Sequence, residues 1–228
     1  MRTIASISQG MPRKTGFTVV ELLVCIVIVA VLMTMGILGA QRFREEARAV
    51  QCVRKLRDLS VLVHNYARDH DGMLAWYVKG QGGVKGIWWY KVWKHCGLPA
   101  REMSKLLTCP SHPDPRILKV GNEEVTFGYR YNKRFGYYND TGAVPTWTYP
   151  LRKMYLAGSP SKVPLLGDSY KMPDNASGFE SWPDIWAAHG NGRYGHVAML
   201  DGHVERIFKA PSASEVPGKY NWDADANF

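Results

Sequence analysis

The sequence predicts an α+β protein in which one long N-terminal helix packs against a small antiparallel-sheet head. Three observations predict this class: an unbroken apolar run near the N-terminus, apolar residues at helical spacing directly after it, and short alternating segments within residues 73–228. The 228 residues are 46% hydrophobic and 21% charged, which suits one domain with an appendage and excludes a disordered chain.

The first half of the predicted helix, residues 17–40, is long and apolar enough to span a membrane. Between Leu22 and Ala40 the only polar side chains are Cys25 and Thr34. A helix over this half extends about 36 Å, against about 30 Å for the hydrocarbon core of a bilayer. Basic residues without acids precede the span, so we expect a single-pass protein with a cytoplasmic N-terminus and an exported C-terminal domain.

The second half of the predicted helix, residues 41–70, has an amphipathic pattern and contains neither proline nor glycine. Its apolar residues recur at three- and four-residue steps: Ala47, Val50, Val53, Leu56, Leu59, Val63, Tyr66 and Ala67. This stripe predicts packing against the head or against neighbouring helices. Asp71 and Gly72 end the helix region at residue 72, and residues 73–228 then form the head.

Glu21 is the unusual residue of the apolar run, because an unpaired carboxylate within a membrane costs several kcal/mol. The segment around it, KTGFTVVELL at residues 14–23, resembles the class III leader of type IV prepilins and type II secretion pseudopilins. The resemblance implies that a prepilin peptidase cleaves between Gly16 and Phe17, removes residues 1–16 as a leader and methylates the new N-terminus. It also implies that Glu21 pairs with the Phe17 amine of a neighbouring subunit.

The resemblance implies a type IV pilin-like fold and a structural subunit of a type IV pilus or a type II secretion pseudopilus. Such a subunit is anchored in the inner membrane with its head in the periplasm. Its partners are the prepilin peptidase, other pilin-like subunits and an inner-membrane assembly platform. Pilus and pseudopilus remain open, as do major and minor subunit. The alternative is a membrane-anchored envelope protein whose eight tryptophans serve a glycan-binding head.

Three segments of the head have strand patterns. Residues 125–131 alternate, residues 162–169 form a short apolar run, and residues 196–208 read as a hairpin with Asp201 and Gly202 in a two-residue type I′ turn. With His189, this region resembles the C-terminal H-X9-DG signature of a lineage of prepilin-type proteins. Here eleven residues, rather than nine, separate His189 from Asp201, so the role of this histidine stays open.

The cysteines leave a disulfide and a metal site as alternatives. Cys25 lies within the apolar run, so at most one pair forms among Cys52, Cys96 and Cys109. The resemblance to the H-X9-DG lineage includes Cys52 and Cys109 and favours that pair, while Cys96 with Cys109 is the alternative. Cys96, Cys109 and His112 are also ligand types that suit zinc.

Other chemistries find less support in the sequence. The net charge of +9 comes from scattered basic residues, and no nucleic-acid recognition motif accompanies them. Asp168, Asp201 and Glu205 offer oxygens to calcium, but no EF-hand spacing is present. No catalytic motif accompanies the histidines, and we expect His196 and His203 to be surface or hairpin-pairing residues on opposite strands of the hairpin. The sequence therefore predicts no enzyme and no required cofactor.

Overall fold

The computed structural model describes residues 16–79, 86–112, 115–139, 146–149, 153–154, 157–168, 178–179 and 188–208. The chain divides into two compact units, Met1–Phe43 and Arg44–Phe228. Helix α1 (Val19–Asp69) runs through both units, and each half is described with its own unit. The α+β class with a long N-terminal helix and small sheets is confirmed.

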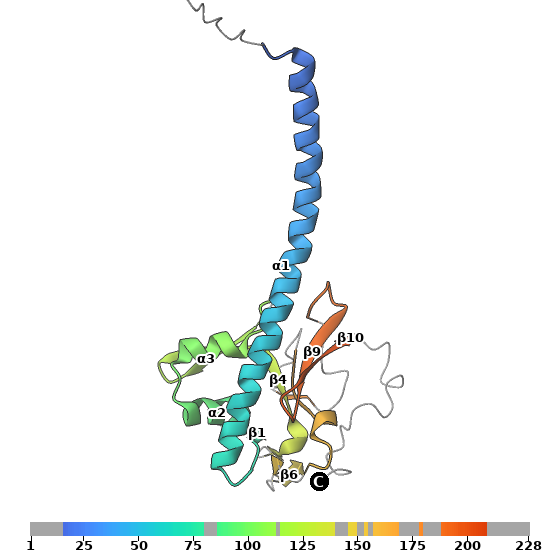
Figure 1. Ribbon diagram of the computed structural model, residues 1–228. Coiled ribbons are helices and arrows are strands. Elements are labelled where there is room, and N and C mark those ends of the chain that lie inside the picture. The colour runs from blue at the N-terminus through green and yellow to red at the C-terminus, as the bar shows by residue number, and fades with distance from the viewer. Residues whose placement is uncertain are drawn as a thin grey trace, which may run out of the picture. The chain divides into compact units, whose positions relative to one another are not determined.

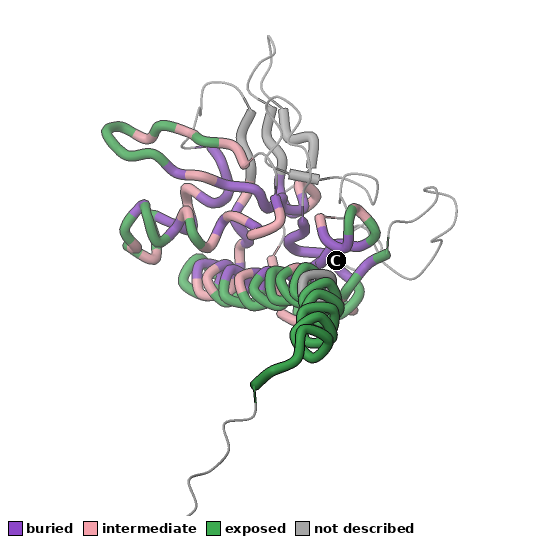
Figure 2. Tube along the Cα trace, turned by 90° about the horizontal axis from the view of Figure 1, so that it is seen from above, coloured by how far each residue is buried: buried purple, intermediate pink, exposed green. Residues whose placement is uncertain are grey.

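The described part of the first unit is the apolar half of α1. Its side chains are exposed from Val19 to Met35, including every valine, leucine and isoleucine of that stretch (Figure 2). Among the described residues, α1 is the one helix long and apolar enough to cross a membrane. Because exposing this much apolar surface to water is unfavourable, lipid or other helices must cover this half of α1.

The second half of α1 buries one face in the head. The buried residues are Ala49, Cys52, Leu56, Leu59, Ser60, Val63, Tyr66 and Ala67. The predicted stripe is therefore right from Leu56 onward and wrong at its start, where Ala47 and Val50 are exposed. On the buried face, Cys52 lies four residues before Leu56, and Ala49 lies three residues before Cys52. Val50 is rotated about 100° from Ala49 around the helix axis and therefore points away from the head.

The predicted end of α1 is confirmed. Gly72 has a φ of 76° and its backbone N–H donates to the carbonyl of Ala67 at 2.7 Å. Asp71 also has a positive φ, 53°, a conformation that aspartate tolerates better than most residues. These two residues turn the chain away from the helix and into the head.

A five-stranded sheet forms the centre of the head, in the order β10-β9-β7-β4-β8. Its strands are β4 (Tyr129–Asn132), β7 (Pro164–Asp168), β8 (Gly178–Phe179), β9 (Tyr194–Met199) and β10 (Val204–Phe208). Strands β4, β9 and β10 are labelled in Figure 1. The pairs are antiparallel except β4 with β8, which is parallel. Every residue of β4, β7 and β9 is buried, so this part of the sheet is covered on both faces.

Smaller elements complete the head. They are β1 (Tyr77–Lys79), α2 (Trp88–Cys96), α3 (Ala100–Leu107), β2 (Arg116–Val120), β3 (Glu123–Phe127), the 3₁₀ turn η2 (Lys133–Phe135), β5 (Tyr137–Asn139), β6 (Thr146–Tyr149) and the 3₁₀ turn η4 (Pro160–Lys162). Strands β2 and β3 form an antiparallel pair, and β1, β5 and β6 form a three-stranded sheet. In that sheet β1 and β5 are parallel.

The single strand predicted over residues 125–131 is broken into β3 and β4 at Gly128. The backbone N–H of Gly128 donates to the carbonyl of Leu107 at 2.8 Å instead of to a strand partner. A Cβ at this position would lie 3.0 Å from Cδ2 of His112, so a side chain fits poorly there. The glycine allows the close approach at which the chain passes from one sheet to the other.

The hairpin is confirmed, but its predicted type I′ turn is wrong. The loop between Met199 and His203 holds three residues, and the Met199 N–H donates to the carbonyl of His203 at 2.8 Å. Gly202 has a φ of 89°, while Asp201 keeps a negative φ. A type I′ turn needs positive φ at both central residues, whereas a three-residue loop with a bulge needs it only at the glycine.

Tryptophans from α2 form much of the core. Trp88 and Trp89 are fully buried, Trp88 stacks on Tyr131 with ring centroids 4.9 Å apart, and Trp93 is also buried. These three side chains are therefore not available for a glycan-binding face. Trp182, Trp186 and Trp222, on which that alternative also drew, lie outside the described residues.

Candidate functional site

The start of α1 carries a capping box that joins Thr18 and Glu21. The backbone N–H and the hydroxyl of Thr18 each donate to Oε2 of Glu21 at 2.8 Å, and the Glu21 N–H donates to Oγ1 of Thr18 at 3.2 Å. This reciprocal pair satisfies backbone N–H groups that a helix start leaves open. Glu21 thus has a partner within its own chain, Thr18, in addition to the intersubunit partner expected from the sequence. The Thr-x-x-Glu spacing is the sequence signal for this capping box.

The two residues before the capping box are accessible. A Cβ built on Gly16 would meet no atom within 4 Å, and the side chain of Phe17 is 79% exposed. No described residue therefore restricts access to the bond between Gly16 and Phe17.

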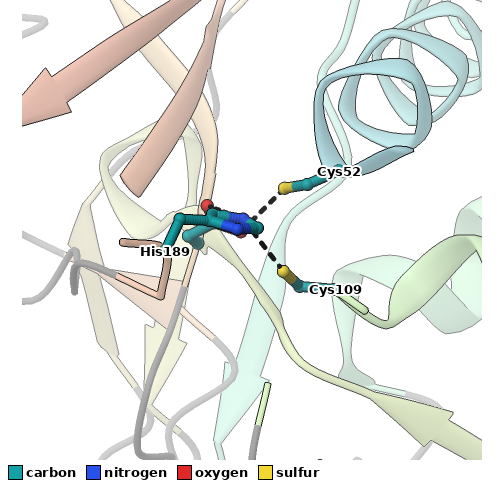
Figure 3. Close-up of side chains that lie close together, drawn as sticks. Cys52, Cys109 and His189 are labelled. Atoms are coloured by element: carbon teal, nitrogen blue, oxygen red, sulfur yellow. Dashed lines mark hydrogen bonds and ion pairs between the residues drawn. The ribbon is translucent and has the colours of Figure 1, made fainter. Parts of the chain in front are cut away.

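The head contains a buried cluster of four metal-ligating side chains: Cys52, Cys109, Asp168 and His189. One ligand atom of each lies within 4.8 Å of the others, and all four residues are buried. Figure 3 shows Cys52 on α1 and Cys109 after α3 pointing toward His189. Asp168 ends β7 and His189 lies shortly before β9. Four segments far apart in the sequence therefore meet at one point of the head.

The cysteines contact the other two members directly. Cys52 Sγ donates to Oδ1 of Asp168 at 3.0 Å and accepts from the Tyr129 hydroxyl at 3.3 Å. Tyr129 is the register partner of Asp168 in the β4–β7 pair, so the sheet fixes both groups beside α1. Cys109 Sγ lies 3.3 Å from Nε2 of His189.

Asp168 and His189 are held by further contacts. Oδ2 of Asp168 accepts the backbone N–H of His196 at 2.8 Å and lies 3.5 Å from Nε2 of His189. The other ring nitrogen of His189, Nδ1, lies 3.5 Å from Oε1 of Glu45 but makes no hydrogen bond with the described residues. Glu45 Oε1 also accepts the Gly190 N–H at 3.2 Å, which fixes the carboxylate beside the histidine.

The four groups shift one another's protonation. Burial raises the pKa of the Cys52 thiol well above its usual value, whereas a hydrogen bond with Cys52 lowers the pKa of Cys109. Burial raises the pKa of Asp168, but hydrogen bonds from His189 and His196 outweigh it and hold that pKa below its usual range. Burial opposes charge on His189 too, yet Asp168 and Cys109 raise its pKa to about 10. Asp168 and His189 therefore each favour the charged form of the other.

The structure brings together only part of the residue sets considered from the sequence. Cys52 and Cys109 lie together in the cluster, as a disulfide between them would require, but no disulfide joins them in this structure. The disulfide between Cys52 and Cys109 therefore stays a prediction. Among the described residues, the group that could hold a metal ion contains Cys109 but neither Cys96 nor His112, so the zinc set of Cys96, Cys109 and His112 stays a prediction without support from this geometry. Cys96 Sγ donates instead to the carbonyl of Trp93 at 3.3 Å, because α2 ends there.

The histidines and acids near the hairpin separate into two environments. His196 pairs with Arg206 across the hairpin, as one of the two expected roles requires, but it is buried beside Asp168 rather than at the surface, because β9 lies between β7 and β10. His203 is partly exposed and contacts Asp201 and Glu205. The three acids considered for calcium thus do not converge, since Asp168 lies in the buried cluster.

Comparison with protein-family models matches residues 11–37 to the prokaryotic N-terminal methylation motif. None of the curated proteins matches the chain, and no solved structure does. The motif covers Gly16, Phe17, the capping box and most of the apolar half of α1. It supports a type IV pilin-like precursor, a class of structural subunits rather than enzymes, with an apolar helix suited to a membrane anchor.

Proposed function

We propose that the protein is a structural subunit of a type IV pilus or a type II secretion pseudopilus. A prepilin peptidase cleaves it between Gly16 and Phe17 and methylates Phe17, and the mature chain polymerises through α1. The observation that carries this proposal is the coincidence of the methylation motif at residues 11–37 with the start of an exposed apolar helix. The same coincidence supports the cleavage point, because the motif includes both residues that flank it.

The exposed apolar half of α1 supplies the contact surface for polymerisation. Before assembly the lipid of the inner membrane covers these side chains, with the N-terminus in the cytoplasm and the head in the periplasm. During assembly, α1 of neighbouring subunits replaces the lipid. The assembly platform of the inner membrane and the other pilin-like subunits are the partners that this exchange requires.

Glu21 sets the register between neighbouring subunits. Cleavage creates an amine at Phe17, and an ammonium group is the partner that a carboxylate in apolar surroundings needs. The hydrogen bonds from Thr18 fix the Glu21 carboxylate at the start of α1. Both of those bonds use Oε2, and a carboxylate accepts several hydrogen bonds, so Glu21 accepts the amine of a neighbour without giving up its cap.

Mass spectrometry of the N-terminus tests this proposal. The protein is extracted from the membranes of its own host, and we expect its first residue to be N-methylated Phe17. A Gly16→Val variant should keep residues 1–16, and a Gly10→Val variant, which changes a glycine elsewhere in the leader, should be cleaved normally. A wild-type chain that retains residues 1–16 would refute the processing and the polymerisation that depends on it.

A further inference from the structure

We propose that Cys52, Cys109, Asp168 and His189 form a structural zinc site that ties the second half of α1 to the central sheet of the head. The site lies entirely within the unit Arg44–Phe228. It goes beyond the proposed function and does not depend on cleavage or on polymerisation.

The separations of the ligand atoms fit a tetrahedral zinc ion. Zinc binds sulfur at about 2.3 Å and nitrogen or oxygen at about 2.0–2.2 Å, so tetrahedral ligand atoms lie about 3.3–3.8 Å apart. In the metal-free cluster Cys109 Sγ lies 3.3 Å from His189 Nε2, which lies 3.5 Å from Asp168 Oδ2. Cys52 Sγ lies 3.0 Å from the other carboxylate oxygen of Asp168, Oδ1, and one ligand atom of each of the four residues lies within 4.8 Å of the others. Side-chain shifts below about 1 Å would complete the site.

The chemistry of the four ligands favours zinc with a structural role. Two thiolates and an imidazole suit zinc better than calcium or magnesium, which prefer oxygen ligands. Four protein ligands close the tetrahedron, whereas catalytic zinc keeps one position open for water or substrate. Because all four residues are buried, the ion would have no access to a substrate. The site is therefore of the closed, structural kind.

Residues next to the cluster contact its four side chains in the way that orients the ligands of known metal sites. A histidine that binds zinc usually directs its second ring nitrogen toward a carboxylate, and Nδ1 of His189 lies 3.5 Å from Oε1 of Glu45. The Tyr129 hydroxyl donates to the Cys52 sulfur, and the His196 N–H donates to Asp168. These contacts leave Nε2 of His189 and both sulfurs directed toward the centre of the cluster.

A disulfide between Cys52 and Cys109 is the competing use of the same sulfurs. It would explain the two cysteines but assign no role to His189 and Asp168, which are fully buried beside them. Zinc binding uses all four groups: the thiol protons and the His189 imidazolium proton leave to solvent, and no oxidant is required. The ion's two positive charges then offset most of the negative charge of two thiolates and one carboxylate.

Metal analysis of the full chain tests the proposal. The protein is purified in detergent, reduced, stripped of metal with a chelator, and loaded with zinc chloride alone. We expect one zinc ion per chain after dialysis. X-ray absorption should show two sulfur atoms at about 2.3 Å and two nitrogen or oxygen atoms at about 2.0–2.2 Å. The absorption spectrum uses the wild-type chain, so it remains decisive even where a variant fails to fold.

Matched variants locate the site. Cys109→Ser should abolish stoichiometric zinc, while Cys96→Ser, which changes a cysteine outside the cluster, should keep it. Glu45→Gln should weaken zinc binding about 10- to 100-fold, as the loss of an outer partner does, whereas Glu46→Gln should leave it unchanged.

Three results would overturn the zinc site. The first is a reduced wild-type chain that retains no stoichiometric zinc. The second is bound zinc without sulfur ligands. The third is a disulfide between Cys52 and Cys109, without metal, in protein isolated from the cell envelope in the absence of reductant.

Discussion

Two valines on the second half of α1 allow a matched test of how this half packs in the head. Val63 is completely buried, whereas Val61, two residues earlier on the same helix, is 57% exposed. Replacement by alanine removes the same atoms from both positions and raises the helix propensity equally. Only the contacts of the side chain with the head differ between the two variants.

The expected difference follows from the burial. Val63→Ala removes two buried carbon atoms, at about 0.8 kcal/mol each, and leaves a partly filled cavity, so the free energy of unfolding should fall by about 2–3 kcal/mol. Val61→Ala should change it by less than about 0.5 kcal/mol. For a domain of this size, Val63→Ala should lower Tm by about 4–12 °C.

Tryptophan fluorescence of the full chain in detergent measures this difference, because the buried Trp88 and Trp89 report on unfolding of the head. Equal shifts for the two valine variants would refute the packing of this helix face. A Val61→Ala variant that is the less stable of the two would mean that the opposite face of α1 is buried.

Three further predictions concern single side chains. Glu21→Gln should leave membrane insertion intact but reduce the polymer recovered by sedimentation at least tenfold, whereas wild-type yield would contradict the register role of Glu21. Gly202→Ala should lower the free energy of unfolding by about 1 kcal/mol, because alanine is strained at a φ of 89°. A denaturant titration in which the free energy of unfolding does not fall would contradict the turn geometry. Burial lowers the pKa of Lys91 from 10.5 to about 8. The charged form of Lys91 is therefore less favourable in the folded head than in the unfolded chain. The resulting destabilisation is complete below pH 8 and disappears as the pH rises toward 10.5. Lys91→Met should therefore raise Tm at pH 7 and raise it less at pH 10. An increase in Tm that is the same at both pH values would contradict the burial of the Lys91 ammonium group.

The parts of the fold that depend on neighbouring residues could be predicted from the sequence. The apolar half of α1, its end at Gly72 and the hairpin after His196 all follow from spacings within a few residues. The amphipathic stripe differs from the prediction at its start, where Cys52 and Ala49 are buried in place of Val50 and Ala47. Its burial is set by the three- and four-residue steps that lead back from Leu56, which the sequence also contains.

The buried cluster could not be predicted in the same way. Its four members come from α1, the segment after α3, the end of β7 and the segment before β9, and no local spacing connects them. Their meeting depends on the order β9-β7-β4 of the central sheet and on the register that sets Tyr129 opposite Asp168. Tertiary pairing of this kind leaves no periodic signal in a single sequence.

A tight turn directly after His189 holds this histidine in the cluster. Three successive residues, Gly190, Asn191 and Gly192, have φ values of 60°, 59° and 80°, so the chain reverses sharply after His189. The reversal lets the His189 N–H donate to the carbonyl of Tyr194 at 2.9 Å and sets the two residues opposite each other at the start of β9. The turn thus returns the chain to the sheet directly after His189, and the pairing of β9 with β7 holds this histidine against Asp168.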